Sequence, residues 1–469
     1  MNSPIDPDTG SDGAAPPLSG GSSDLARLVR LAIPLIAAHS GQQLMSFVDA
    51  AMVGRLDAAA IGGVGIGNSV FFGVSVMGMG TILGMDPVVA QAAGAGEHGR
   101  ARRTLWQGAR IALAMSVPLM ILVVLLSLAL DPLGIEPSTA GETRRFLWAR
   151  LPNIPPFLLF VAARSYLQSE GGARAIVVST VLANVANALF NFLLIYGDGG
   201  LTSIGLPGIG IPALGVVGSG LSSSIASVVS LIVCVRGIER ITPPPDPERR
   251  RSDPEIRAKI LKLGIPLALQ ILAEVGAFTI ASILAGRMGK GPAAGYQVAI
   301  TLASLTFTVT LGLGAATSVL VGQAIGRKDT PAARRVGFLS LKAALVFMSL
   351  GAAAFLLFPG PLARILTDSP EVLAAAIPLV QIAGFFQLSD GAQVVAAGAL
   401  RGAGDTKYSQ RANVVGHYLV GLPVAIGLGF GLGMGGPGLW WGLSAGLTTV
   451  AVMLTLRFHS ISKARMERV

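Results

Sequence analysis

Three acidic residues lie inside long apolar stretches of this sequence, namely Asp49, Glu274 and Asp390. None of them has a lysine or arginine within one helical turn along the chain. An ionised side chain at the centre of a bilayer costs about 2.5 kcal/mol or more, so such residues are functional candidates. Each acid can take up a proton or, when ionised, bind a cation. The alternative is a neutral acid that hydrogen-bonds to a neighbouring helix and only stabilises packing.

Neutral oxygen ligands are also present in the first half of the chain. Asn184, Asn187 and Asn191 fall in one apolar stretch, and the last two are four residues apart, on one face of a helix. Ser223 lies in a run of small residues further along. These groups either supply oxygens to a cation beside Asp49 or bridge adjacent helices, and the residues themselves leave both interpretations open.

The elements that must position these side chains are membrane-spanning helices. The 469 residues are 52% hydrophobic and 13% charged, about half the charge of a soluble protein. Apolar runs of membrane-spanning length recur along the chain, which predicts an all-α polytopic membrane protein. The twelve expected helices run near 26–55, 58–84, 101–130, 141–168, 174–196, 213–236, 256–287, 292–322, 332–358, 371–400, 408–432 and 437–459.

The basic residues predict how the helices are oriented. If both termini and the even-numbered connections lie on one side, that side holds 28 of the 35 Lys and Arg residues. The positive-inside rule makes this side cytoplasmic. The net charge of +10 is then explained by orientation and not by nucleic-acid binding. The expected domains are a disordered cytoplasmic tail (1–24), an N-lobe (25–236), a cytoplasmic linker (237–255), a C-lobe (256–460) and a second cytoplasmic tail (461–469).

The two halves repeat each other at a constant offset of 232 residues. At this shift Leu31–Leu35 matches Leu263–Leu267, and Gln91 matches Gln323. One offset through three helices indicates an internal duplication, with two six-helix lobes related by a pseudo-two-fold axis along the membrane normal. Glu274 then falls on Gln42, seven residues or about 10.5 Å from the Asp49 position on equivalent helices. The halves should therefore share architecture without sharing an identical site.

The remaining polar residues predict little further chemistry. Glu170 and Asp405 sit among glycines and basic residues and are expected to be solvated, while Arg164 and Arg401 are expected to snorkel towards the bilayer surface. Cys234 is the single cysteine, and the four histidines are scattered. The sequence thus offers no disulfide, no metal cluster and no catalytic constellation, and we expect neither an enzyme nor a cofactor.

Several motifs together resemble the multidrug and toxic compound extrusion (MATE) family, in its NorM-like branch. They are Pro34 with Phe47-Val-Asp-Ala-Ala-Met-Val-Gly54, Glu274-Val-Gly-Ala-Phe278, Gly314-Ala-Ala-Thr-Ser-Val-Leu-Val-Gly322 and Ser389-Asp-Gly-Ala-Gln-Val-Val-Ala-Ala-Gly398 with Arg401. The resemblance begins near residue 25 and covers nearly the whole chain.

This resemblance implies a V-shaped pair of lobes that exchanges cationic drugs for Na⁺ or H⁺. It implies an N-lobe cation site at Asp49 with Asn187, Asn191 and Ser223, and a C-lobe site at Glu274 and Asp390. Phe386 stands where some Na⁺-coupled relatives have a tyrosine. The missing hydroxyl favours H⁺ over Na⁺. Asn184 is a further site candidate, and the expected cavity-lining residues are Gln42, Met45 and Phe386.

The predicted function is secondary multidrug efflux by alternating access. The coupling ion is H⁺ or Na⁺, with any Na⁺ at Asp49 or between Glu274 and Asp390. The expected partners are small organic cations and the lipid bilayer, with no nucleic acid, for a monomer in a bacterial inner membrane with both termini cytoplasmic. A lipid-carrier flippase and a facilitator-superfamily transporter are the nearest alternatives, and a channel or an intramembrane enzyme fits the residues less well.

Overall fold

The computed structural model describes residues 22–132, 134–241 and 250–469, and these residues form helices and connecting loops. The first half contains α1 (Ser22–Val53), α2 (Ala58–Ile82), α3 (Met85–Gly94), α4 (His98–Leu128), α5 (Pro137–Arg150), α6 (Ile154–Ser169), α7 (Ala173–Ser203) and α8 (Val216–Glu239). The second contains α9 (Pro254–Arg287), α10 (Lys290–Gly326), α11 (Thr330–Leu357), α12 (Pro359–Arg364), α13 (Pro370–Ala403), α14 (Thr406–Val414), α15 (Leu422–Ile426) and α16 (Gly436–Ile461). Residues 242–249 of the predicted linker lie outside the described residues.

The helices confirm the predicted membrane architecture. Among the described residues, eleven helical segments are long and apolar enough to cross a bilayer, and α1 adds a further helix of 32 residues. The largest difference from the predicted boundaries is at the end of the second helix. The sequence suggested that the second helix ends near residue 84, whereas the chain makes a short turn and continues as α3 to Gly94. The second span is therefore longer than predicted, from Ala58 to Gly94, and it contains Asp86.

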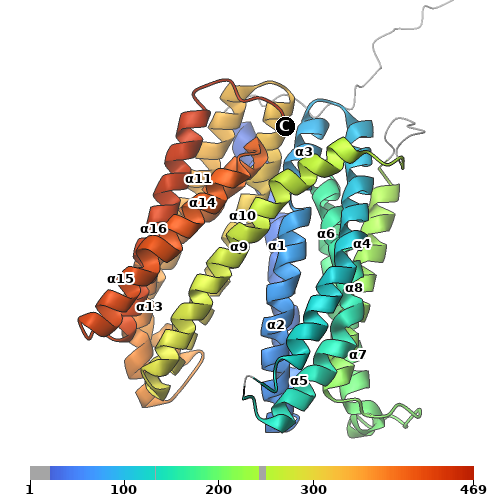
Figure 1. The fold of residues 1–469 in the computed structure, drawn as a ribbon, viewed down its shortest axis with the longest axis vertical. Helices are drawn as coiled ribbons and strands as arrows, with labels where there is room; N and C mark the ends of the chain where they lie inside the picture. Colours follow the sequence, from blue (N-terminus) through green and yellow to red (C-terminus); the bar gives the residue numbers. More distant parts are fainter. Residues whose placement is uncertain (1–21, 133, 242–249) are drawn as a thin grey trace, which may run out of the picture.

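The two six-helix lobes form a V (Figure 1). They meet at the end where α3, the first turns of α9 and the last turns of α10 lie, which we call the closed end, and they diverge towards the other, open end. The lobes exchange contacts there, since α1 packs against α10 and α2 packs against α9. The 461–469 segment also lies at the closed end.

The contacts between the lobes repeat with the sequence offset. A Cβ built on Gly80 would lie 2.4 Å from Cα of Ala268, and one built on Gly312 would lie 2.7 Å from Cα of Ile36. Adding 232 to Gly80 gives Gly312, and adding 232 to Ile36 gives Ala268. Each lobe therefore makes the same contact on the other, which is the relation that a pseudo-two-fold axis generates. The glycines permit this close backbone approach between membrane helices.

One span of the C-lobe departs from α-helical geometry. Between α14 and α16 the chain forms two π-helical stretches, η2 (Val415–Gly421) and η3 (Gly427–Gly431), on either side of α15. A π-helical turn rotates the side chains that follow it and is often found at functional sites. In this case it places His417 in the interior of the C-lobe, where its side chain is 1% exposed.

Candidate functional site

Asp49 lies in a buried polar cluster of the N-lobe. It occupies the last part of α1, while Asn187 and Asn191 project from successive turns of α7 and Ser223 from α8. The Asn191 amide nitrogen donates to Asp49 at 2.5 Å and lies 3.3 Å from the Asn187 side-chain oxygen. All four side chains are at least nine-tenths buried. The structure therefore brings together the four residues that the resemblance grouped.

Several polar atoms around Asp49 have no partner among the described residues. They are the Asn187 amide nitrogen, the Asn191 side-chain oxygen and the Ser223 hydroxyl. Such buried groups ordinarily find a hydrogen bond or a ligand. Asn184, on the same helix, donates its amide one turn back to the Thr180 carbonyl oxygen, while its side-chain oxygen has no partner among the described residues.

Arg150 is a member of this region that the sequence analysis missed. Its guanidinium lies within electrostatic reach of Asp49, donates to Asn68 and stacks over the Phe71 ring at 4.4 Å. Arg150 ends α5, where a basic residue is expected to reach solvent. No sequence signal distinguishes it from the other helix-end arginines. It supplies positive charge next to Asp49 from a different helix.

Glu274 and Asp390 form a second acidic centre in the C-lobe. Glu274 lies on α9 and Asp390 on α13, within electrostatic reach of each other. Gln393, one turn after Asp390, donates its amide to Glu274 at 3.3 Å. Asp390 and Gln393 are 3% and 1% exposed. The structure therefore brings together the two acids that the resemblance grouped.

Aromatic rings border this acidic centre. Phe386 lies one turn before Asp390, is 3% exposed, and makes edge-on contacts with Phe278 and Trp440 at centroid distances of 6.1 and 5.5 Å. Phe278 also contacts the His417 ring at 6.1 Å. Both ring nitrogens of His417 lack a partner among the described residues. Phe386 is therefore packed among the buried apolar side chains of the C-lobe.

The other predicted lining residues lie on α1. Gln42 is exposed and Met45 is half-buried, and both lie on the same helix as Asp49. Their exposure fits a surface that faces the space between the lobes. The Gln42 side chain interacts with His39, one turn earlier on α1.

A third group of buried charges lies near the closed end and was not predicted. Asp86 is 2% exposed, lies 3.7 Å from Arg401 of the C-lobe and accepts a hydrogen bond from Gln168 at 3.3 Å. Arg164 is 8% exposed and lies within electrostatic reach of Asp86. The prediction that Arg164 and Arg401 snorkel is therefore wrong, because both converge on a buried acid. Asp86 escaped notice because it seemed to fall in a loop.

Two glutamines join the lobes at the closed end, and we call their contacts the glutamine clasp. The Gln91 amide donates to the Gly402 carbonyl oxygen at 3.0 Å, and the Gln323 amide donates to the Ser169 carbonyl oxygen at 2.9 Å. Gln91 and Gln323 are related by the 232-residue offset, so each lobe holds the end of a helix in the other. The sequence marked the pair only as evidence of duplication.

The 461–469 segment adds an asymmetric link. Arg468 forms two hydrogen bonds with the Glu97 carboxylate of the N-lobe, at 2.8 and 2.7 Å. The Val469 amide donates to the Gln91 side-chain oxygen at 2.8 Å. The hydrogen bonds from Arg468 hold the pKa of Glu97 below its usual value. The segment therefore joins the C-lobe to the N-lobe at neutral pH.

The two acids predicted to be solvated are paired instead. The Glu170 side chain is 5% exposed and bonds to the His98 ring at 2.8 Å. Burial raises the pKa of Glu170, and His98 opposes this effect. Asp405 accepts a hydrogen bond from Arg457 at 2.7 Å. The prediction is wrong for Glu170, which sequence neighbours alone could not place beside His98 on another helix.

Comparison with known proteins identifies the repeat and the family. The family model MatE matches residues 34–193 and again residues 266–426. The starts of the two matches are 232 residues apart, which confirms the internal duplication.

Curated relatives align over nearly their entire lengths. The chain is 31% identical to the multidrug resistance protein NorM of Aliivibrio fischeri, over 92% of this chain and 94% of the relative. It is 33% identical to a probable multidrug resistance protein NorM of Agrobacterium fabrum, over 93% and 94%.

Solved structures agree with this fold. One is described as the outward-facing conformation of a multidrug resistance MATE family transporter, with a TM-score of 0.84 and 20% identity over 94% of this chain and 97% of that one. A eukaryotic MATE transporter matches with a TM-score of 0.79 and 21% identity, over 92% and 95%. The repeated family match and the full-length relatives confirm the resemblance to the NorM-like proteins, and the chain belongs to the MATE family of secondary membrane transporters.

Proposed function

We propose that this protein exports cationic or amphiphilic organic compounds from a bacterial cell in exchange for H⁺ or Na⁺, with H⁺ favoured. One observation carries the proposal. Buried carboxylates occur in both lobes, at Asp49 and at Asp390, which lies beside the half-buried Glu274, and polar atoms without partners among the described residues surround them. Such groups bind a cation or a proton more readily than they serve packing. The relatives named as multidrug resistance proteins support the class of substrate.

Competition for these carboxylates would couple the two fluxes. A drug cation and a coupling ion cannot both neutralise the same acid in a low-dielectric site. Entry of the coupling ion from outside would release the drug and favour return to the inward-facing state. Each elementary charge that moves through the membrane field gains about 2.3 kcal/mol per 100 mV.

The C-lobe centre supports the preference for H⁺. The Gln393 amide donates to Glu274 there, and the bordering rings of Phe278, Phe386 and Trp440 carry no hydroxyl oxygen. Na⁺ needs several oxygen ligands, whereas a proton needs only one acceptor. The N-lobe is richer in oxygens, at Asn187, Asn191 and Ser223. If Na⁺ drives transport, the Asp49 cluster is its expected site.

We further propose that the closed end faces the cytoplasm and that the V opens to the outside. Most basic residues lie in the connections at the closed end, as the positive-inside rule requires of the cytoplasmic side. The glutamine clasp and the Glu97–Arg468 pair would then close the cytoplasmic side. Alternating access requires these contacts to break in the inward-facing state.

Efflux from liposomes tests the proposal. Purified protein is reconstituted with a fluorescent organic cation, and pH and Na⁺ gradients are imposed separately. Transport driven by a pH gradient alone is the expected result. Transport driven by Na⁺ at constant pH would overturn the preference for H⁺ but retain antiport. No transport under either gradient would contradict the proposed function and favour the flippase alternative.

A further inference from the structure

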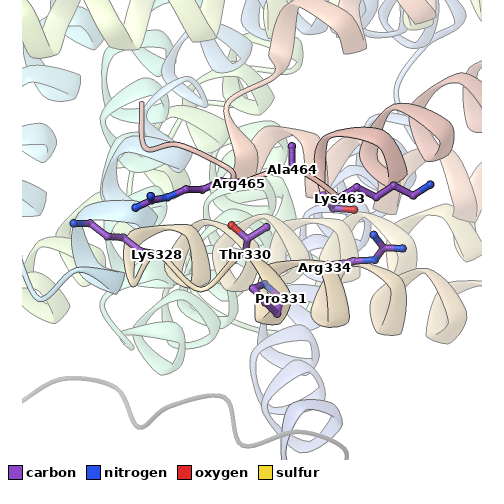
Figure 2. A pocket seen from close by; sticks show the side chains of 8 residues that line it. Lys328, Thr330, Pro331, Arg334, Lys463, Ala464 and Arg465 are labelled. Atoms are coloured by element: carbon purple, nitrogen blue, oxygen red, sulfur yellow. The ribbon is translucent and has the colours of Figure 1, made fainter.

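Four basic side chains gather on a pocket at the closed end of the C-lobe. The pocket has a volume of about 500 Å³ and lies between the first turn of α11 and the segment that follows α16. Its lining includes Lys328, Arg334, Lys463 and Arg465. Figure 2 shows Lys328 and Arg465 towards one end of the pocket and Arg334 and Lys463 towards the other, with Thr330 between them.

These four cations have no acidic partner in the part of the chain that the structure describes. Within the described ranges, no ion pair joins any of them to a carboxylate. The nearest acid along α11, Asp329, already accepts a hydrogen bond from the Ala332 amide at the start of that helix. Four like charges at one pocket repel each other unless an anion neutralises them. The pocket is also shaped by the fold, because the Met466 amide donates to the Thr330 hydroxyl at 3.1 Å.

A largely apolar groove lies on α16, the helix that leads into this pocket. The groove has a volume of about 330 Å³ and lies between α13 and α16. Its lining includes Ala392 and Thr448 with the exposed side chains Val452 and Leu456. At 100° per residue, Thr448, Val452 and His459 lie within a stripe about 40° wide on α16, and Lys463 follows two residues after this helix ends at Ile461.

His459 connects the groove to the pocket. It lies on the same stripe of α16, stacks against Phe338 of α11 at 5.8 Å, and lies within electrostatic reach of both Lys463 and Arg334. The distance along α16 from Thr448 to His459 is about 16.5 Å. A largely apolar groove on a helix that leads into a cationic pocket matches an acyl chain that is joined to a phosphate.

We propose that this surface binds an anionic phospholipid, with the headgroup phosphate on the four basic side chains and one acyl chain in the groove. Basic pockets at the bilayer surface recognise lipid headgroups in this way. Lys463 and Arg465 belong to the segment whose Arg468 holds Glu97 of the N-lobe. A bound lipid would therefore order the segment that links the lobes. The site does not depend on the transported substrate or on the coupling ion.

Native mass spectrometry of the detergent-purified full chain tests the site. Phosphatidylglycerol is added, with phosphatidylcholine as the zwitterionic comparison and inorganic phosphate as a competitor. The double variant Lys463→Gln/Arg465→Gln is expected to bind phosphatidylglycerol roughly 10- to 30-fold more weakly. The matched control is Arg287→Gln/Lys290→Gln, which removes two exposed charges from the open end of the same lobe and should bind normally.

Two further variants separate the site from the stability of the segment. Lys328→Gln/Arg334→Gln lies outside the 461–469 segment and should weaken phosphatidylglycerol binding to a similar degree. Ala392→Phe fills the groove and should weaken binding of the lipid, although it leaves the charge of the protein unchanged. Binding by all three variants within twofold of the control would overturn the proposal. So would displacement of the lipid by millimolar inorganic phosphate, since the pocket would then hold a free anion.

Discussion

Asp49 accepts a hydrogen bond from an amide and lies near an arginine. The two C-lobe acids lie close to each other, with one amide donor beside them. Asn191 donates to Asp49, and Arg150 lies nearby. Among the residues that the structure describes, Glu274 accepts a hydrogen bond from the Gln393 amide alone. We therefore expect the N-lobe acid to be the better cation ligand and the C-lobe pair to be the better proton carrier.

The first prediction concerns the Asp49 charge. Asp49→Asn removes the only carboxylate of the cluster while keeping its size, so gradient-driven efflux should fall at least roughly tenfold, the factor for each 1.36 kcal/mol of lost ion binding. The measurement is efflux of the fluorescent cation from proteoliposomes. Asp57→Asn is the control, because Asp57 is exposed and caps α2. Equal efflux by both variants would contradict a coupling role for Asp49.

A second prediction follows from the closeness of Glu274 and Asp390. Two acids within electrostatic reach titrate as a pair, so the loss of either changes the role of the other. The costs of Glu274→Gln and Asp390→Asn in substrate-binding free energy should therefore not add in the double variant. Asp49→Asn with Glu274→Gln, in opposite lobes, should add. Both binding series are measurable by calorimetry, and additivity in the C-lobe pair as well would show that its acids act independently.

At the scale of elements, the sequence predicts most of the spans and misses the contacts between them. Apolar runs locate the helices because a bilayer leaves few alternatives. Asp86 was missed because its position seemed to fall in a loop, yet α3 continues the helix there. The π-helical turns around His417 and the pairing of Glu170 with His98 depend on packing between helices. Neither leaves a local signal in the chain.

The link between the 461–469 segment and α4 gives a third prediction. Arg468 lowers the pKa of Glu97. The pair therefore stabilises the closed end at pH values above those at which carboxyl groups usually titrate. This stabilisation is lost as the pH falls through the lowered pKa. At pH 7, Glu97→Gln should therefore open the closed end, and at pH values below that pKa the variant and the unchanged protein should converge.

Spin-label distances check this prediction. Labels at Arg174→Cys and Lys407→Cys, with Cys234→Ser, report the separation of the lobes at the closed end, since both positions are exposed. Glu255→Gln is the matched control, because its pair with Lys259 is within α9 and exposed. If Glu97→Gln leaves the distance distribution unchanged at pH 7, the Arg468 contact does not hold the lobes together.

At the scale of the whole molecule, the two-fold relation makes the closed end doubly sensitive to backbone spacing. A Cβ built on Gly94 would lie 2.1 Å from the Gln323 carbonyl oxygen, and one built on Gly326 would lie 2.1 Å from the Gln91 carbonyl oxygen. These are the same contact seen from each lobe, beside the glutamine clasp. Backbone atoms cannot move aside as a flexible side chain can, so any methyl group there must separate the lobes.

Gly94→Ala and Gly326→Ala should therefore have equivalent effects. Overpacking of this kind costs about 1–3 kcal/mol, and that cost falls only on the conformer in which the closed end is shut. Both variants should move the spin-label distances towards the state that is open at this end. Gly286→Ala, which meets nothing within 4 Å, should not. A shift in only one of the two glycine variants would mean that the lobes do not move as symmetric rigid bodies, and that the Glu97–Arg468 link dominates the closure.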